Sequence, residues 1–269
     1  ISLEDAQSQV RRGLGKLTAP GADGLDRPVA LGDQVELIIK PGGTSAFLLG
    51  TDKLGRDVLS RMIHGSRISI IIAAIAILIA GSIGTILGIA AGYFGGWVDA
   101  VVMRLAEVAF SIPVILIAMC LVVALGASFK TIIITLVMFL WATYARQTRG
   151  DTLTVRVQDY IARARVSGAS HLRIMLRHVF PNVLNSLVVI ATLQVGFVII
   201  LESTLSFLGA GIPRPTPAWG LMVADGRELI VAAWWVALFP GVAILLVVMS
   251  MNLLGDWLRD RLDPKQRQA

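Results

Sequence analysis

The stretch ISIIIAAIAILIAGSIGTILGIAAG, residues 68–92, contains no charged side chain and decides the fold class. A transmembrane helix needs about 20 mainly apolar residues, because its backbone must satisfy its own hydrogen bonds across about 30 Å of hydrocarbon. This stretch is therefore predicted to cross a membrane. Small residues that allow close approach of another helix, within this chain or in another subunit, recur at every fourth position of it. They are Ala76, Ala80, Gly84, Gly88 and Gly92.

Four later segments are also long and apolar. Together with the first they predict an all-α, polytopic transmembrane helical bundle. The five predicted spans are residues 68–92, 108–125, 131–145, 183–209 and 231–254. Trp141 and Tyr144 are expected at the interfacial end of the third span, since aromatic side chains favour that level of the bilayer. Only 16% of the chain is charged, below the roughly 25% of soluble domains, so lipid is the expected solvent.

The net charge of +6 fits orientation in a membrane better than binding to nucleic acid. Lys and Arg lie between apolar segments, whereas a nucleic-acid site needs a basic face with exposed aromatic residues. Residues 146–180 contain seven arginines and two aspartates, and a short loop with such an excess of arginine stays in the cytoplasm. Alternation of the spans then predicts a cytoplasmic tail and an external loop at residues 211–230.

The same alternation predicts three regions along the chain. Residues 1–67 form an external segment, residues 68–255 form the transmembrane domain with a cytoplasmic loop at 146–182, and residues 256–269 form the cytoplasmic tail. An external N-terminal segment without a signal sequence would be awkward to translocate. We therefore expect a sixth span before Ile1, which would leave both ends in the cytoplasm.

The end of the external segment contains an amphipathic pattern. Asp57 can cap a short helix in which Val58, Leu59, Met62 and Ile63 share one face. This short helix either lies along the outer interface or forms an amphipathic entry to the first span.

The cytoplasmic loop contains two predicted short helices. The first covers residues 159–166, and Ser167 and Gly168 then interrupt it. Ser170 can cap the second, which runs to residue 180, where Pro181 marks the break before the fourth span. The second helix carries an apolar stripe of Leu172, Met175, Leu176 and Val179. An amphipathic helix of this kind is typical of docking onto a partner, although a solvated loop is the simpler alternative.

This loop also resembles a known family. The stretch Tyr-Ile-Ala-Arg-Ala-Arg-Val-Ser-Gly-Ala-Ser, residues 160–170, with a Pro-Asn pair at 181–182, is similar to the signature loop of ABC importer permeases. In that family the loop forms coupling helices that sit in a cleft of the ATPase subunit. By position, the resemblance implies a coupling role for Tyr160, Ala162, Arg163, Ala164, Gly168, Ala169, His171 and Pro181. Ala162 stands where the family often has a glutamate, so this chain lacks the salt bridge that a glutamate could form there.

Further stretches resemble the dipeptide and oligopeptide branch of these permeases, specifically the second permease of the heterodimeric pair. They cover residues 49–69, 92–99, 207–222 and 252–264, in the order of the family. The resemblance implies the type I permease fold, a further N-terminal span and a location in the prokaryotic cytoplasmic membrane. It also implies a related partner permease, two cytoplasmic ATPase subunits that bind ATP and Mg²⁺, and an external substrate-binding protein.

Catalytic and metal sites are not expected in this chain. The sequence lacks a Gly-x-x-x-x-Gly-Lys-Ser/Thr loop, so no ATP hydrolysis by the chain itself is expected. His64, His171 and His178 are dispersed and predict no metal centre. Cys120 is the only cysteine, and a small core residue is its simplest interpretation. No cofactor is therefore expected on the chain.

Two polar residues of the fourth span are candidates for the translocation path. Glu202 is a carboxylate deep in an apolar segment, where a charge costs on the order of 2–3 kcal/mol, so it should face protein or water. It lies either on the path or in a hydrogen bond between helices. Gln194 is a weaker candidate, since amides in spans often join helices.

The external loop is a candidate docking surface for the binding protein. Pro213, Pro215 and Pro217 stiffen it, and Arg214 and Trp219 are the side chains proposed to present the surface. A rigid loop with Trp219 as an interfacial anchor explains the same residues.

The main alternative is a secondary transporter or channel, because such proteins also have five or six spans with small-residue stripes. The loop at residues 160–181 distinguishes the two, since a secondary transporter needs no docking site for an ATPase. A membrane enzyme is disfavoured because no catalytic cluster lies at a plausible depth. Short peptides, nickel chelates and glutathione are all substrates of relatives with these motifs.

Overall fold

The computed structural model describes residues 18–20, 26–28, 39–45 and 47–262 and is almost entirely helical. The helices are α2 (Val58–Phe94), α3 (Gly96–Ser111), α4 (Val114–Leu125), α5 (Phe129–Val155), α6 (Asp159–Val166), α7 (His171–Ile174), the π-helical turn η1 (Met175–Val179), α8 (Phe180–Phe207), α9 (Trp219–Arg227) and α10 (Trp235–Leu262). Two three-residue strands, β1 (Thr18–Pro20) and β2 (Asp26–Pro28), pair antiparallel. The predicted sixth span, about half of the external segment and the last seven residues lie outside the described residues.

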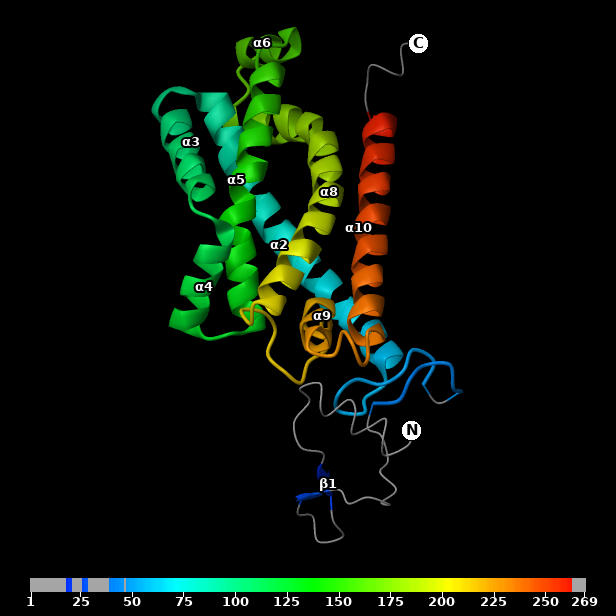
Figure 1. Cartoon of the computed structure of the whole chain (residues 1–269). Coiled ribbons are helices and arrows are strands. Elements are labelled where there is room, and N and C mark those ends of the chain that lie inside the picture. The colour runs from blue at the N-terminus through cyan, green and yellow to red at the C-terminus, as the bar shows by residue number, and fades with distance from the viewer. Residues whose placement is uncertain (1–17, 21–25, 29–38, 46, 263–269) are drawn as a thin grey trace.

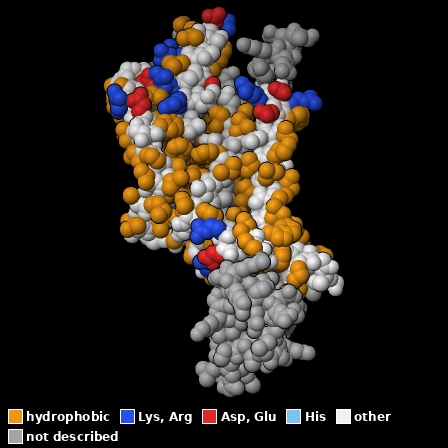
Figure 2. All heavy atoms as spheres, in the orientation of Figure 1, with side chains coloured by type: hydrophobic (Ala, Val, Ile, Leu, Met, Phe, Trp, Pro, Cys, Tyr) orange, Lys and Arg blue, Asp and Glu red, His pale blue; other side chains and the backbone are white. Residues whose placement is uncertain are grey.

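Within the part of the chain that the structure describes, four helical segments are long and apolar enough to cross a membrane: α2, α5, the continuous segment His171–Phe207, and α10. The bent pair α3 and α4 could form a fifth. These helices run side by side between an end that carries α6 and an opposite end that carries α9, called here the α6 end and the α9 end (Figure 1). Hydrophobic side chains cover the middle of the visible face, and charged side chains gather at both ends (Figure 2). The prediction of an all-α transmembrane bundle is confirmed.

The sequence predicted one span over residues 108–125, but the structure bends within this stretch. It divides between the last turn of α3 and the whole of α4, and these two helices meet at 83°. The break occurs at Ile112, whose backbone is extended (φ −100°, ψ 125°), directly before Pro113. A residue before proline is pushed out of the helical region by the proline ring, which explains the bend.

The separate interfacial helix is also a wrong prediction. Asp57 does cap a helix, because its carboxylate accepts a hydrogen bond from the backbone N–H of Ser60 at 2.8 Å. That helix, however, is α2 itself, which continues without interruption to Phe94. The amphipathic entry to the first span is the arrangement that the structure adopts, with Val58 buried and Ile63 exposed.

The remaining spans keep their predicted positions but differ in their ends. α5 continues to Val155 and α10 to Leu262, so the first part of the predicted loop and of the predicted tail is helical. The predicted external loop at 211–230 contains the helix α9. Tyr144 is buried against α2, and its place at the interfacial end of the third span stays a prediction.

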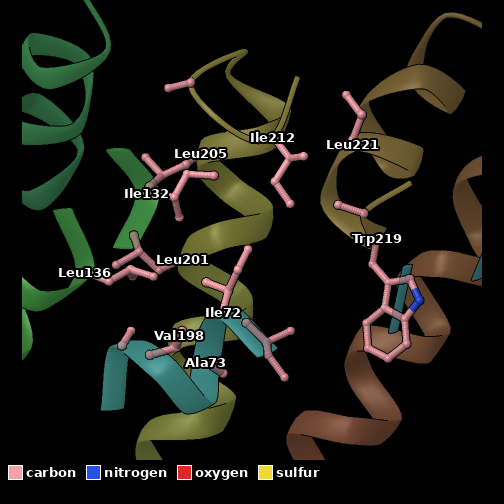
Figure 3. Close-up of a cluster of buried hydrophobic side chains, with 14 of the residues drawn as sticks. Ile72, Ala73, Ile132, Leu136, Val198, Leu201, Leu205, Ile212, Trp219 and Leu221 are labelled. Atoms are coloured by element: carbon pink, nitrogen blue, oxygen red, sulfur yellow. The ribbon is translucent and has the colours of Figure 1, made fainter. Parts of the chain in front are cut away.

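The small-residue stripe of α2 faces α5 within this chain. A Cβ added to Gly84 would lie 2.3 Å from the carbonyl oxygen of Trp141, and one added to Gly92 would lie 2.7 Å from Cβ of Thr152. Ala76 and Ala80 are fully buried in the main core. Apolar side chains from α2, α5, α8 and α9 converge in the same core, towards the α9 end (Figure 3).

Candidate coupling site at the α6 end

The α6 end is formed by a bent helical segment, called here the elbow, that comprises α6, the turn at residues 167–170, α7 and η1. Gly168 has a positive φ of 78°, a backbone conformation that glycine adopts without strain, and it allows the chain to reverse between α6 and α7. The Ser170 hydroxyl then accepts a hydrogen bond from the backbone N–H of Arg173 at 3.3 Å and caps α7. The first predicted short helix, the interruption at Ser167 and Gly168, and the start of the second helix agree with the structure.

The predicted break at Pro181 is wrong. α7, η1 and α8 form one continuous helical segment, His171–Phe207, with Pro181 in its first α-helical turn after η1. A proline within a helix lacks an N–H, and its ring clashes with the carbonyl of the residue four positions earlier. That residue is Arg177, which lies in the π-helical turn Met175–Val179. The wider π-helical ring accommodates the proline without a break.

The predicted apolar stripe of the second helix does not form one buried face. Val179 is buried, together with Ile174, in a second core that also includes Tyr93 of α2 and Ile161 of α6. Leu172 and Leu176, by contrast, line an apolar groove of about 630 Å³ between α2 and the η1–α8 segment. The elbow is therefore packed firmly onto the bundle by one set of side chains, while the other set faces the groove.

Most of the coupling candidates lie on the open surface of the elbow. Ala162, Arg163, Gly168, His171 and Pro181 are exposed, and Tyr160, Ala164 and Ala169 are half-buried. Val166, at the end of α6, is 90% exposed among arginines. The exposed face of α6 therefore combines an apolar side chain with cationic ones.

Polar contacts fix the bundle beneath the elbow. Arg149 of α5 forms an ion pair with Asp99 of α3. The guanidinium of Arg156 donates a hydrogen bond to the carbonyl oxygen of Gly92 at 2.9 Å. These contacts join α5 to α3 and to the end of α2. Sequence reasoning did not assign them, although Gly92 and Asp99 bound one of the stretches that carry the family resemblance.

Glu202 is fully buried between helices. Its carboxylate accepts hydrogen bonds from the hydroxyls of Ser206 at 2.7 Å and Ser69 at 3.4 Å, so it joins α8 to α2. Gln194 is half-buried on α8, eight positions earlier. The structure does not bring the two path candidates together, and the bonds of Glu202 are those of a link between helices.

At the α9 end, Trp219 does not present a docking surface, and that prediction is wrong. Its side chain is buried in the main core (Figure 3), and its indole N–H donates to the carbonyl oxygen of Met62 at 2.9 Å. Trp219 therefore ties α9 to the start of α2. Arg214 is exposed as expected, and it pairs with the buried carboxylate of Asp225, which raises the pKa of the Arg214 guanidinium.

A network of charged residues surrounds this pair and was not predicted. Lys53 lies 3.9 Å from Asp225. The carboxylate of Asp52 is also buried. Its Oδ2 lies 2.7 Å from a guanidinium nitrogen of Arg56 and 3.5 Å from Nε of Arg61 on α2. Buried carboxylates are retained in proteins when they are paired in this way. The network connects the segment before α2 and the start of α2 to α9, which lies far away in the sequence.

The matched part of the chain decides its family. Residues 84–268 match the family described as the inner membrane component of binding-protein-dependent transport systems. The chain belongs to this family. The match covers the elbow, α9 and α10, and the permease is thus an inner-membrane subunit of an ABC importer.

Curated relatives support the same assignment. The permease is 42% identical to the glutathione transport system permease protein of Pectobacterium atrosepticum, over 84% of this chain and 75% of the relative. It is also 42% identical to the di/tripeptide transport system permease protein of Pseudomonas aeruginosa, over 85% of this chain and 75% of the relative. Both relatives are named as permease proteins of transport systems.

Solved structures share the fold. The permease resembles a chain of the MetNI methionine ABC transporter in an inward-facing conformation, with a TM-score of 0.62 and 18% identity, over 76% of this chain and 97% of that one. A chain of an amino acid ABC transporter matches with a TM-score of 0.54 and 14% identity, over 78% of this chain and 95% of that one. The predicted permease fold is confirmed.

Proposed function

We propose that this permease carries short peptides, including peptide-like thiols such as glutathione, into the cell by alternating access driven by partner ATPase subunits. The elbow at the α6 end is proposed to be the docking surface for an ATPase. The observation that supports this is the elbow itself, which is packed on the bundle through Ile161, Ile174 and Val179 while Val166 and Arg163 are exposed. Because the elbow is both exposed and packed on the bundle, a partner that displaces the elbow would also displace the membrane-spanning helices.

The charge distribution supports an orientation with the α6 end in the cytoplasm. The predicted loop contains seven arginines, and Arg259 and Arg261 of α10 lie at the same end (Figures 1 and 2). Arginine-rich short segments are retained on the cytoplasmic side during insertion. ATP and Mg²⁺ would then bind to the partner ATPases on this side.

The proposed assembly contains a related partner permease, two ATPase subunits and an external substrate-binding protein. The binding protein would approach the α9 end, where Arg214 is exposed. Dipeptides and tripeptides are the preferred cargo within the proposal because one of the matched relatives transports them by name. Another is named for glutathione, a peptide-like molecule with the same kinds of charged ends.

Coexpression with the partner subunits tests the docking surface. Gly168→Pro should abolish association with the ATPase in a pull-down, because proline cannot adopt the positive φ of this turn. Gly150→Ala is the matched control, since Gly150 lies on the exposed side of α5 with open space around it. Normal association of the Gly168 variant would contradict the docking role of the elbow, whereas ion-driven transport by the chain alone would favour a secondary transporter.

Uptake assays test the cargo. Cells with the assembled system should accumulate a labelled dipeptide and labelled glutathione in an ATP-dependent manner, and cells without this chain should not. Accumulation of a nickel chelate but of neither peptide would contradict the proposed substrate class.

A further inference from the structure

Both helices of the elbow contact the same side chain of α2, that of Tyr93. The Tyr93 hydroxyl lies 2.9 Å from Nδ1 of His171, the first residue of α7. The guanidinium carbon of Arg165, on α6, lies 5.4 Å from the centre of the Tyr93 ring, within the range of a cation–π interaction. Tyr93 is itself buried, so α6 and α7 are both in contact with one side chain that is held in place by its surroundings.

The aromatic rings around His171 restrict how it can move. The ring of His171 is edge-on to Tyr93, with centres 5.7 Å apart, and is tilted against Phe94 at 5.9 Å. Tyr93 and Phe94 are also edge-on to each other at 5.2 Å. Edge-to-face pairs of this kind favour one orientation, so the hydrogen bond and the ring contacts define the same position of α7.

Tyr93 lies on a part of α2 that packs tightly against α5. Its neighbour Gly92 is so close to α5 that an added Cβ would lie 2.7 Å from Cβ of Thr152, and its carbonyl oxygen accepts from Arg156. α2 and α5 therefore behave as one packed pair at this end. A displacement of the elbow must either move this pair or break the contacts of Tyr93.

We infer that Tyr93 is a positioning residue for transport, which transmits the displacement of the elbow to the α2–α5 pair through His171 on α7 and Arg165 on α6. This inference rests on the proposed function, because an ATPase must displace the elbow. The residues act through contacts within the chain and do not touch the transported molecule.

The test uses the complete transporter, with partner permease, ATPases and binding protein, in proteoliposomes. The quantity measured is the amount of labelled dipeptide taken up per ATP hydrolysed. Tyr93→Phe removes the hydroxyl but keeps the ring, and His171→Ala removes its partner. Loss of this one hydrogen bond in Tyr93→Phe should lower the ratio by about fivefold. His171→Ala also removes the ring contacts of His171 and should lower the ratio at least as much. Tyr93→Ala, which also removes the contact with Arg165, should lower it further.

A double variant strengthens the test. If Tyr93 and His171 act through each other, Tyr93→Phe with His171→Ala should lower the ratio about as much as His171→Ala alone, since effects of contacting residues are not additive. Should Tyr93→Ala fail to assemble, the nearly isosteric Tyr93→Phe decides. Arg104→Ala is the control, because it removes an exposed ion pair with Glu107 on α3 and leaves the elbow intact.

The outcomes separate this inference from the proposed function. A working wild type with an unchanged ratio in Tyr93→Phe and His171→Ala would overturn the inference alone. An equal fall in the Arg104 control would overturn it too, since the effect would then not belong to Tyr93. A wild-type complex that shows no ATP-dependent uptake would overturn the proposed function and the inference together.

Discussion

Gly88 of α2 and Ala145 of α5 lie so close that a Cβ on Gly88 would be 2.5 Å from the carbonyl oxygen of Ala145. The same Cβ would lie 2.8 Å from Cβ of Thr148. Neither obstacle is the end of a flexible side chain, so a larger residue at this position must push the two helices apart. The small-residue stripe of α2 thus determines the distance between α2 and α5.

Substitution of Gly88 should destabilise the permease. We expect Gly88→Ala to lower the thermal stability in detergent by an amount that corresponds to about 1–3 kcal/mol, as overpacked cores do. Gly88→Leu should prevent assembly. The measurement is the melting curve of the purified protein, with Gly81→Ala as the matched control because its Cβ would meet Tyr144 only at an ordinary 3.5 Å. Equal stability of the two alanine variants would contradict the packing argument.

Glu202 should contribute to stability more than to the path. Removal of its carboxylate in Glu202→Ala leaves the hydroxyls of Ser69 and Ser206 without their buried acceptor, which should cost about 1–3 kcal/mol of stability. Glu202→Gln keeps a carbonyl oxygen as an acceptor and should assemble and transport almost normally. The checks are melting temperature and uptake in parallel. A Glu202→Gln variant that is stable but inactive would instead place the residue on the translocation path.

The sequence predicted the long helices well because their signal is local. About 20 apolar residues in a row identify a span whatever the rest of the fold does, and Gly168 with Ser170 marks the turn of the elbow through backbone and capping preferences. The bend before Pro113 also has a local cause, although the apolar pattern across it had concealed the break.

The contacts at the α9 end were harder to predict because many of them join distant segments. Asp52 pairs with Arg61 and lies in the same network as Asp225, and nothing in the local sequence indicates which charges meet. The burial of Trp219 is a similar case, since an aromatic residue in a proline-rich loop is equally compatible with an interface. Its position depends on the start of α2, which is more than 150 residues earlier.

Trp219 provides the last prediction. Its indole N–H is the donor to the carbonyl oxygen of Met62, so Trp219→Phe should keep the buried ring but lose the hydrogen bond between α9 and α2. We expect a loss of stability of about 1 kcal/mol. Hydrogen exchange of α9 should also rise, because the helix is then less firmly held. Trp97→Phe is the control, since Trp97 is largely exposed on α3. If α9 exchanges at the same rate in both variants, the hydrogen bond of Trp219 does not hold it.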